Sequence, residues 1–454
     1  MNDRKRKSAG VRPELWKRSV DESRRRLIQG AGIGMASLAL PGFLLGDDEV
    51  AKGREIRIGF VSPATGVLEN FAERDDFVLA HARKSLEQGI VIGGKRHPIR
   101  IIARDSESSA TRASEIAASL IRDDKVDLML ASSTPDTVNP VSDQCEKHGV
   151  PCITTDCPWQ AYFFGRGGKQ ETGFEWTYHF FWGLEDIVQV YLNLWGEIET
   201  NKVVGALWPD DTDGRAFAGE EHGFPKPLAA HGFKLVDPGR FAPTHWDFSE
   251  QIRQFKAAGA EIVTGLLTAS AFAAFWTQAV QQAFTPKIAT VAKGLLFPSA
   301  IEALGPLGAG LTTEVWWSPN HPFKSGLTGQ ITAEFCAQYE DETHRQWTQP
   351  IGFQHALFEL AVDTLKRTKD VDSPAAIRDA LRSTDYDSIV GHIAWKGEPV
   401  KNVTRTPLVG GQWFPGREFK NWAHGREFKY DLVIVNNDSY PAIGQQDKLK
   451  PIHW

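Results

Sequence analysis

Hydroxyl and carboxyl side chains gather at two points of the sequence where predicted strands end. These side chains are Ser132, Ser133 and Thr134, which follow the apolar run 128–131, and Thr154, Thr155 and Asp156, which follow the run 150–153. In a parallel sheet both strand ends emerge at the same carboxyl edge, where open α/β sheets bind ligands. Hydroxyls and free backbone N–H groups at a helix start suit a carboxylate or another small anion. Ser and Thr also cap helices without any ligand, so a purely structural role is the alternative for each loop.

Aromatic side chains provide candidate walls for such a site. The sequence contains fifteen Trp, a residue that buries a large area with little rotamer freedom and so suits both cores and ligand sites. The candidate walls are Phe71, Trp159, Trp182 and Trp208. Taken singly, each of these is more often a core residue.

An acidic turn and a cysteine pair were weighed as metal sites. The turn 209–214 partly resembles a calcium loop, with Glu220 at the last ligand position, but Pro209 at the first position cannot coordinate through a side chain. Cys152 and Cys157 have a C-x4-C spacing that no second Cys or His pair completes. We therefore predict no metal, and a solvated turn is the simplest structure for the acidic segment.

Motifs of the common enzyme classes are absent from the sequence. It contains no G-x-S-x-G, no H-E-x-x-H, no phosphate-binding loop and no G-x-G-x-x-G. We therefore predict a protein that is not an enzyme and that carries no cofactor.

The elements that must position these residues alternate between strand and helix, which is typical of parallel sheets with right-handed crossovers. One unit has predicted strands at 56–61, 99–103, 128–131 and 150–153, and another has them at 202–208, 233–236, 261–267 and 288–292. Between the units, the aromatic and glycine-rich stretch 162–182 is predicted to be a surface excursion. A predicted crossing at 311–317 and two long helices, 329–343 and 351–369, follow the second unit.

The first 46 residues are predicted to be a targeting segment. Residues 23–28, Ser-Arg-Arg-Arg-Leu-Ile, resemble the twin-arginine export motif, and a weakly apolar run, 30–45, follows. This segment carries ten Lys/Arg and four Asp/Glu, so the whole-chain charge of −6 leaves about −12 for the remainder. A strongly acidic remainder argues against nucleic acid and anionic membranes as partners. A disordered basic tail on a cytoplasmic protein is the alternative.

Five stretches resemble, in order, landmarks of the branched-chain amino-acid binding family of periplasmic solute-binding proteins. They are IRIGFVSPATGVLENFA, LMLASSTPDTVNPVSDQCEKHGVPCITTD, VVGALWPDDTDGRAFA, KIATVAKGLLFPS and IVGHIAWKGE. The resemblance covers most of residues 55–400. It implies an α/β fold with two doubly wound parallel-sheet lobes joined by three crossing strands, and a ligand trapped between the lobes. It also implies delivery of that ligand to a membrane permease of an ABC transporter.

With this resemblance, we expect the chain to divide into a signal segment and two lobes. The expected limits are 1–46 for the twin-arginine signal segment, 54–181 plus 318–389 for the N-terminal lobe, and 182–317 plus 390–454 for the C-terminal lobe. The stretch 162–182 and the tail beyond residue 401 depart from the short members of the family.

The resemblance also gives two residues a sharper meaning. Members of the family often place a ligand-touching residue where this chain has Asp213. Amino-acid binders of the family carry an acidic residue for the α-ammonium group where this chain has Lys293. A Lys facing the cleft would repel an ammonium at close range, whereas a Lys facing solvent before a helix would have no such role.

We therefore predict a periplasmic binding protein, exported by a twin-arginine signal, for a small organic acid that lacks a free α-amine; the candidate walls fit an aromatic acid. Its predicted partners are the small-molecule ligand and the permease, with no nucleic acid and no direct membrane insertion after signal removal. The alternatives are a binder of an amino acid or amide, and a periplasmic ligand sensor of the same fold.

Overall fold

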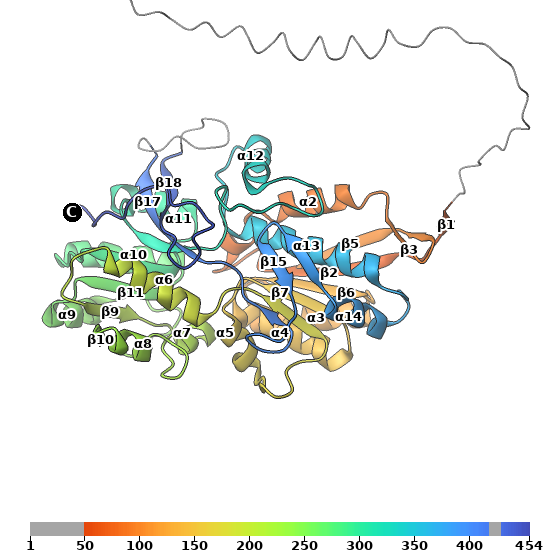
Figure 1. Cartoon of the computed structure of the whole chain (residues 1–454). Coiled ribbons are helices and arrows are strands. Elements are labelled where there is room, and N and C mark those ends of the chain that lie inside the picture. Colours follow the sequence, from red (N-terminus) through yellow and green to blue (C-terminus); the bar gives the residue numbers. More distant parts are fainter. Residues whose placement is uncertain (1–49, 417–427) are drawn as a thin grey trace, which may run out of the picture. The chain divides into compact units, whose positions relative to one another are not determined.

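Two large β-sheets, with helices packed on their faces, organise the protein (Figure 1). The structure, a computed structural model, describes residues 50–416 and 428–454. The predicted signal segment 1–46 lies outside the described residues. We call the parts of the chain built around the two sheets the first lobe and the second lobe.

The first sheet has six strands, all parallel, in the order β16-β8-β7-β6-β2-β5. The strands are β2 (Ile56–Ser62), β5 (Ile99–Asp105), β6 (Leu128–Ser132), β7 (Cys152–Thr155), β8 (Thr177–Phe180) and β16 (Val403–Thr404). The residues of β6, β7 and β8 are buried throughout. Such continuous burial is expected where helices cover both faces of a parallel sheet.

Side chains alternate between two helical layers on this sheet. Helices α2 (Asp75–Ser85) and α13 (Pro350–Arg367) pack on one face, where Phe60 belongs to the main core. Helices α3 (Ala110–Arg122) and α4 (Pro135–His148) pack on the other, where Val61 belongs to a separate core. Because successive residues of a strand point to opposite faces, the apolar strand β2 supplies both cores.

The second sheet is mixed, in the order β10-β9-β11-β12-β13-β17-β18. Its parallel strands are β9 (Val203–Leu207), β10 (Lys234–Val236), β11 (Ile262–Leu267), β12 (Ile288–Lys293) and β13 (Thr312–Val315). The tail adds β17 (Val409–Pro415) and β18 (Tyr430–Asn436), which are antiparallel. The predicted α/β fold with parallel sheets is thus confirmed, and the antiparallel pair extends it.

Shorter elements complete the described chain. The remaining strands are β1 (Ala51–Lys52), β3 (Ile90–Ile92), β4 (Lys95–His97), β14 (Asp385–Ser388) and β15 (Gly391–Ala394). The remaining helices are α5 (Trp159–Phe163), α6 (Leu184–Gly196), α7 (Thr212–Phe217), α8 (Pro225–Ala230), α9 (Ser249–Ala258), α10 (Ala269–Gln281), α11 (Pro298–Ala303), α12 (Thr332–Thr343) and α14 (Pro374–Arg382), with 3-10 turns η1 (Glu69–Phe71), η2 (Phe164–Arg166) and η3 (Gly305–Gly308).

The chain passes between the sheets after β8, after β13 and after β16. The third passage lies later than the expected boundary at residue 390. Strand β16 pairs with β8 of the first sheet, so Val403 and Thr404 belong to the first lobe. The hairpin of β14 and β15 precedes it and packs on α13 of the same lobe. The expected assignment of residues 390–404 to the second lobe is therefore wrong.

The prediction that the stretch 162–182 is a surface excursion is also wrong in part, because the stretch contains the buried strand β8. The histidine of this strand is hydrogen-bonded inside the lobe. The Nδ1 atom of His179 lies 2.8 Å from the hydroxyl of Thr154, and its Nε2 atom lies 2.8 Å from the carbonyl of Cys157. A strand with a hydrogen-bonded histidine in the core lacks the apolar run by which buried strands are predicted.

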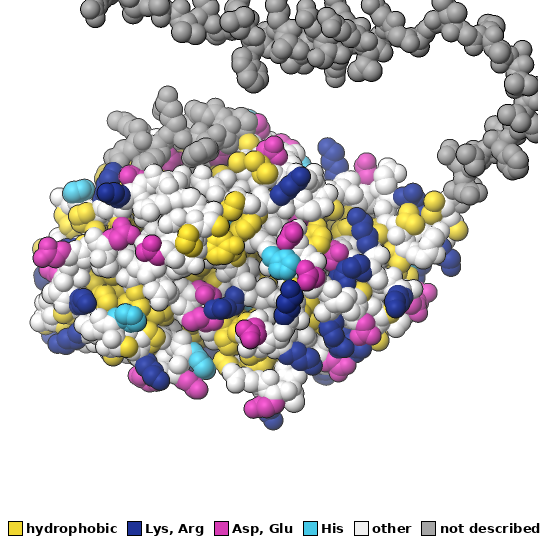
Figure 2. Space-filling view, viewed as in Figure 1, with side chains coloured by type: hydrophobic (Ala, Val, Ile, Leu, Met, Phe, Trp, Pro, Cys, Tyr) yellow, Lys and Arg dark blue, Asp and Glu magenta, His cyan; other side chains and the backbone are white. Residues whose placement is uncertain are grey.

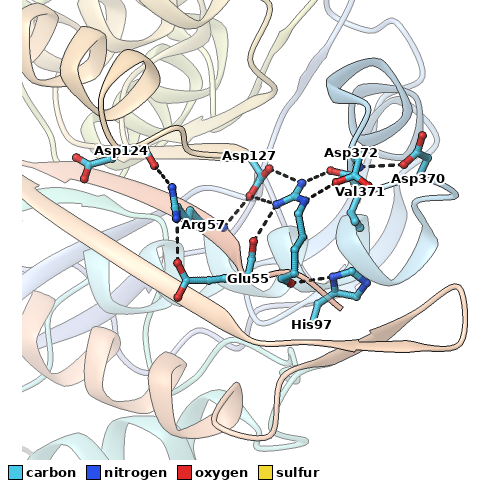
Figure 3. Close-up of polar contacts among 9 residues, drawn as sticks. Glu55, Arg57, His97, Asp124, Asp127, Asp370, Val371 and Asp372 are labelled. Atoms are coloured by element: carbon cyan, nitrogen blue, oxygen red, sulfur yellow. Dashed lines mark hydrogen bonds and ion pairs between the residues drawn. The ribbon is translucent and has the colours of Figure 1, made fainter. Parts of the chain in front are cut away.

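At the amino edge of the first sheet, a charged network ties the chain together (Figure 3). Arg54, just before β2, forms ion pairs with Asp127 at 2.7 Å and with Asp372 at 2.5 Å, and it donates to the carbonyl of Val371. Asp127 also accepts from the backbone N–H of Arg57 at 2.8 Å. These charge-assisted bonds join the starts of β2 and β6 to the loop before α14, which braces the first lobe opposite its carboxyl edge.

The surface carries charges of both signs. On the face seen in Figure 2, basic and acidic side chains are intermingled over both lobes. That face therefore presents no extended field of one sign.

Candidate functional site

A cavity lies between the two sheets, at the carboxyl ends of their parallel strands. Its lining includes residues that directly follow β7, β8 and β13, namely Asp156, Phe181 and Trp316. The lining surrounds about 330 Å³ of space free of protein atoms, part of which is open to solvent, so only a small molecule would fit. The position is the one that the strand order of an open α/β sheet predicts for a ligand.

Half of the predicted site residues line this cavity. They are Phe71, Thr134 and Asp156 from the first lobe, Trp182 from the crossing after β8, and Asp213 and Lys293 from the second lobe. A ligand in the cavity would therefore touch both lobes.

Thr154 and Thr155 do not line the cavity, although they end a strand beside it. The hydroxyl of Thr155 donates to the carbonyl of Phe180 at 2.7 Å. The hydroxyl of Thr154 donates to Nδ1 of His179 at 2.8 Å, because Nε2 of that ring donates to the carbonyl of Cys157. Both hydroxyls thus bond across to β8 within the sheet, and the expectation that they donate to a ligand fails because the neighbouring strand already uses them.

Ser132 and Ser133 stand just behind the lining. The hydroxyl of Ser132 donates to Oδ2 of Asp156 at 2.6 Å, so it positions a lining carboxyl. The hydroxyl of Ser133 is buried and has no hydrogen-bond partner among the described residues.

Backbone strain gathers at the same strand ends. Ser133, Asp156 and Lys293 have φ values of 144°, 75° and 68°. Side-chain-bearing residues adopt such values at a cost of order 1–3 kcal/mol each, and they do so mostly at binding sites.

Two of the predicted aromatic walls belong to the core instead. Trp159 donates from Nε1 to Glu185 at 3.0 Å, and Trp208 packs against Phe217 and Phe224 at ring distances of 5.9 and 5.3 Å. Neither Trp159 nor Trp208 lines the cavity. Aromatic residues beside a strand end fill the layer beneath a site as readily as its wall, which explains the failure.

Several lining residues were missed by the sequence analysis. They are Phe181, Phe217, Glu314 and Trp316, together with the apolar Leu266 and Leu296. The rings of Trp316 and Phe181 meet edge to face at 4.9 Å. The strand-end rule that marked Asp156 applies equally to Trp316, which follows β13, but the segment 311–317 was taken for a crossing.

Lys293 is buried and paired, contrary to the expectation that it presents a free positive charge to the ligand. Its Nζ atom lies 3.0 Å from Oδ2 of Asp213 and 3.6 Å from Oδ2 of Asp211. Burial opposes the charged form, but the two carboxylates outweigh burial and raise the pKa of Lys293. The lysine is thus charged, but its charge is compensated, and the argument that it repels an ammonium loses its basis.

Three carboxyl groups line the cavity, and burial raises the pKa of each. It raises the pKa of Asp156 to about 8, against the hydrogen bond from Ser132 that lowers it. It raises the pKa of Glu314 to about 7, although the Tyr191 hydroxyl donates to this carboxyl at 2.7 Å. The pKa of Asp213 is likewise raised by burial, while Lys293 opposes the shift. Near neutral pH these groups can therefore exchange protons with a ligand.

The rims of the two lobes touch around the cavity. The rings of Phe71 and Phe297 lie 5.1 Å apart at an angle of 78°. The hydroxyl of Thr212, which begins α7 in the second lobe, donates at 2.6 Å to Asp136 in the first turn of α4 in the first lobe. The described structure is therefore a closed arrangement.

Among the residues that line the cavity, several buried polar atoms have no hydrogen-bond partner within the described part of the chain. They are Oγ1 of Thr134, Oδ1 of Asp156, Oδ1 of Asp213, and the indole Nε1 atoms of Trp182 and Trp316. Buried polar groups are nearly always paired. A lining with both unpaired donors and unpaired acceptors is suited to a polar small molecule that supplies the missing partners.

Metal sites and membrane spans are two further possibilities for residues 50–416 and 428–454. These residues include no group of three or more His, Cys, Asp or Glu that could hold a metal ion. No helix among them is long and apolar enough to cross a membrane.

Comparison with known proteins agrees with this arrangement. The sequence profile of the family described as "Periplasmic binding protein" matches residues 55–414. A leucine-binding protein from Thermotoga maritima is similar in structure, with a TM-score of 0.67, 16% identity, and coverage of 84% of this chain and 99% of that protein.

Two solute-binding proteins of ABC transporters from Rhodopseudomonas palustris are also similar. One was solved with 3,4-dihydroxybenzoic acid and has a TM-score of 0.64 at 16% identity, with coverage of 84% and 98% of the two chains. The other was solved with benzoate and has a TM-score of 0.63 at 14% identity, with coverage of 85% and 98%.

Proposed function

The chain belongs to the periplasmic binding protein family, and from this premise we propose that it is the solute-binding component of an ABC transporter. The observation that carries the proposal is the cavity lined by both lobes. Its lining residues Thr134, Asp156, Asp213, Trp182 and Trp316 each have a buried polar atom without a partner in the part of the chain that the structure describes. A ligand that supplies these partners stabilises the closed form, and a closed, loaded protein is what a permease would recognise.

For the ligand we propose a small organic acid, with an aromatic ring. The rings of Phe71, Phe181, Trp182 and Trp316 line the cavity and suit a flat apolar body. The hydroxyl of Thr134 and the indole N–H groups are donors for a carboxylate, and Thr134 heads helix α4, whose N-terminus favours negative charge. Two structurally similar proteins were solved with benzoate and with a dihydroxybenzoic acid, which supports the same class.

An amide is the second candidate, because the lining offers acceptors as well as donors. The unpaired oxygens of Asp156 and Asp213 would accept from an amide N–H2 group, and the indoles would donate to its carbonyl. The compensated charge of Lys293 also leaves an amino acid as a candidate.

Titration calorimetry with benzoate, benzamide and leucine tests these ligand classes directly. The proposed class requires that benzoate or a substituted benzoate binds with at least micromolar affinity, whereas tighter binding of leucine or benzamide would replace it. Small-angle scattering of the unliganded and liganded protein tests the hinge, since a ligand that stabilises closure reduces the radius.

For localisation we propose the periplasm, reached through a twin-arginine signal in residues 1–46. The support is the sequence around Arg24 and Arg25 and the family membership. Replacing both arginines with lysine should leave the protein in the cytoplasm, and cell fractionation of the wild type and the double variant measures this. Normal export of the variant would show that another route is used.

A further inference from the structure

Asp156 lines the cavity and has one carboxyl oxygen without a hydrogen-bond partner among the described residues. The residue is 5% exposed. Its Oδ2 atom accepts from Ser132 at 2.6 Å, while Oδ1 is buried without a partner among the described residues. Asp156 directly follows β7 and has a φ of 75°. Its backbone is therefore fixed by the edge of the sheet, and its carboxyl group is fixed in turn by the bond to Ser132.

Asp213, a lining residue of the opposite lobe, also has one carboxyl oxygen without a hydrogen-bond partner among the described residues. The residue is 3% exposed. Its Oδ2 atom pairs with Lys293 at 3.0 Å, and Oδ1 is buried without a partner among the described residues. Asp213 lies in the first turn of α7, directly beside Thr212, which already bonds to the first lobe.

We propose that Asp156 and Asp213 are paired hydrogen-bond acceptors for O–H groups of the ligand, so that the cavity selects aromatic acids bearing hydroxyl groups over the unsubstituted acids. This inference rests on the proposed function. Two hydroxyl groups on the ring, one donating to each carboxyl group, would join the two lobes. The ligand carboxylate would accept hydrogen bonds from Thr134 and the indole N–H groups. One molecule would thus supply partners for the unpaired donors and for the unpaired acceptors.

An unsubstituted acid would leave these acceptors unmet. A site built to hydrogen-bond a hydroxyl discriminates strongly against an analogue that lacks it, because buried polar groups are then left unpaired. The hydroxylated acid avoids this penalty.

The two kinds of ligand have opposite proton linkage. A hydroxyl that donates to Asp156 favours its ionised form, so binding releases protons when burial keeps the free carboxyl partly protonated. A bare carboxylate favours the protonated form and takes protons up. Asp156 is faced by Ser132 on β6, Thr155 on β7 and the charge of Asp75 on α2.

Asp213 is faced by a different set of charges. They come from Lys293 on β12, from Asp211 before α7 and from Asp136 on α4. The lysine keeps Asp213 closer to ionisation than burial alone would. We therefore assign most of the proton release to Asp156.

The test compares three benzoates by calorimetry on the wild-type protein at pH 7.5. 3,4-Dihydroxybenzoate has both donors, 3,4-dimethoxybenzoate keeps both oxygens but has no O–H group, and benzoate has neither. We expect 3,4-dihydroxybenzoate to bind at least tenfold more tightly than the other two. Repeating the titration in two buffers of different ionisation enthalpy should show proton release for the dihydroxy acid and proton uptake for benzoate.

The variants Asp156→Asn and Asp213→Asn locate the acceptors. Each keeps the side-chain shape and should reduce the preference for the dihydroxy acid to about threefold or less. Asp105→Asn is the matched control, because Asp105 accepts from Thr65 on the exposed rim of the same lobe and should leave the preference unchanged. If one variant fails to fold, the other and the wild-type comparison still decide.

Distinct outcomes overturn the inference and the proposed function. Equal or tighter binding of benzoate or the dimethoxy acid overturns the inference and leaves the acid-binding function standing. Binding of benzamide or benzylamine without any of the acids overturns both, and so does the absence of binding by every compound in the set.

Discussion

The hydroxyl of Thr212 donates a hydrogen bond of 2.6 Å to Asp136, and this bond joins the second lobe to the first. Thr212 opens helix α7 and Asp136 lies in the first turn of α4. Both residues are partly buried, so the bond is made at the rim of the closed cleft and must break when the lobes separate. The bond therefore stabilises the closed form relative to the open form and does not stabilise either lobe by itself.

Replacing Thr212 with Val should shift the unliganded protein towards an open form. The variant keeps the side-chain volume and removes one hydrogen bond to a carboxylate, which at a half-exposed rim is worth about 1 kcal/mol, or about fivefold in the closed-to-open ratio. Small-angle scattering should show a larger radius than in the wild type, and ligand affinity should fall by a similar factor.

The control for this variant is Thr65→Val. The hydroxyl of Thr65 donates to Asp105 at 2.7 Å within the first lobe, so its loss leaves the balance between open and closed forms unchanged. If Thr65→Val enlarged the radius as much as Thr212→Val, the rim bond would have no specific role in closure.

Thr155→Val should lower stability without weakening ligand binding. The Thr155 hydroxyl donates to the carbonyl of Phe180 inside the sheet, and removing it leaves a buried acceptor unpaired at a cost of about 1–3 kcal/mol of unfolding free energy. Thr134→Val should do the opposite. Thr134 caps α4 without a side-chain hydrogen bond and lines the cavity with a free hydroxyl.

Thermal unfolding and calorimetry on the two variants separate these roles. The expected pattern is a lower melting temperature for Thr155→Val with native affinity, and a tenfold or greater loss of affinity for Thr134→Val with a near-native melting temperature. A loss of affinity in Thr155→Val at an unchanged melting temperature would place its hydroxyl in the site after all.

Lys293→Met should destabilise the protein strongly, because the lysine compensates two carboxylates. Lys293 is 8% exposed and lies between Asp213 and Asp211. Removing one partner of a buried ion pair leaves an uncompensated charge, which costs about 3–5 kcal/mol. Denaturant unfolding at pH 7.5 measures the loss.

Lys287→Met is the matched surface control. Lys287 pairs with Glu261 at 3.1 Å at the start of the same strand, and both side chains are substantially exposed. Exposed pairs contribute about 0–1 kcal/mol, so this variant should differ from the wild type by no more than that. Similar losses in both variants would mean that the Lys293 pair is effectively solvated.

Sequence patterns were sufficient to predict the alternating fold and the sheet edge at which the cavity lies. Strand–helix alternation determines which strand ends share an edge, and that rule correctly placed Thr134, Asp156 and Lys293 in the lining. It could not show that the hydroxyls of Thr154 and Thr155 are used by β8. Hydrogen bonds to a neighbouring strand depend on the tertiary structure. In addition, the polar residues of β8 interrupt the apolar run by which a buried strand is predicted.

The sequence likewise could not show that the charge of Lys293 is compensated by carboxylates. Lys293 and Asp213 are eighty residues apart in the chain, and only the fold brings them to 3.0 Å. The third passage between lobes was placed too early because β16 has only two residues, which is too short to produce a periodic pattern.

Stability should fall as the pH rises from 6.5 to 8.5, which is the last prediction. Burial raises the pKa of Asp156 to about 8 and those of Asp75 and Glu359 to about 7. A carboxyl whose pKa is higher in the folded state binds more protons when folded. Its contribution is therefore complete below its unfolded pKa of about 4 and is lost as the pH rises through the folded pKa.

Buried histidines act in the other direction, but only at lower pH. Burial lowers the pKa of His179, His321 and His355 to about 3. Each therefore adds stability as the pH rises from 3 to about 6.5, and above that value the group is neutral in both states. The window from pH 6.5 to 8.5 thus isolates the carboxyl groups.

Chemical denaturation of the unliganded protein at intervals across this window tests the sign. Each titrating carboxyl lowers the unfolding free energy by at most about 1.4 kcal/mol per pH unit. Asp156→Asn keeps an acceptor for Ser132 and removes one titration, so its profile should be flatter than that of the wild type, most clearly between pH 7 and 8. A wild-type profile that is level or rising across the window would show that these carboxyls are already ionised in the folded protein, and the proton release expected of a hydroxylated ligand would then be absent too.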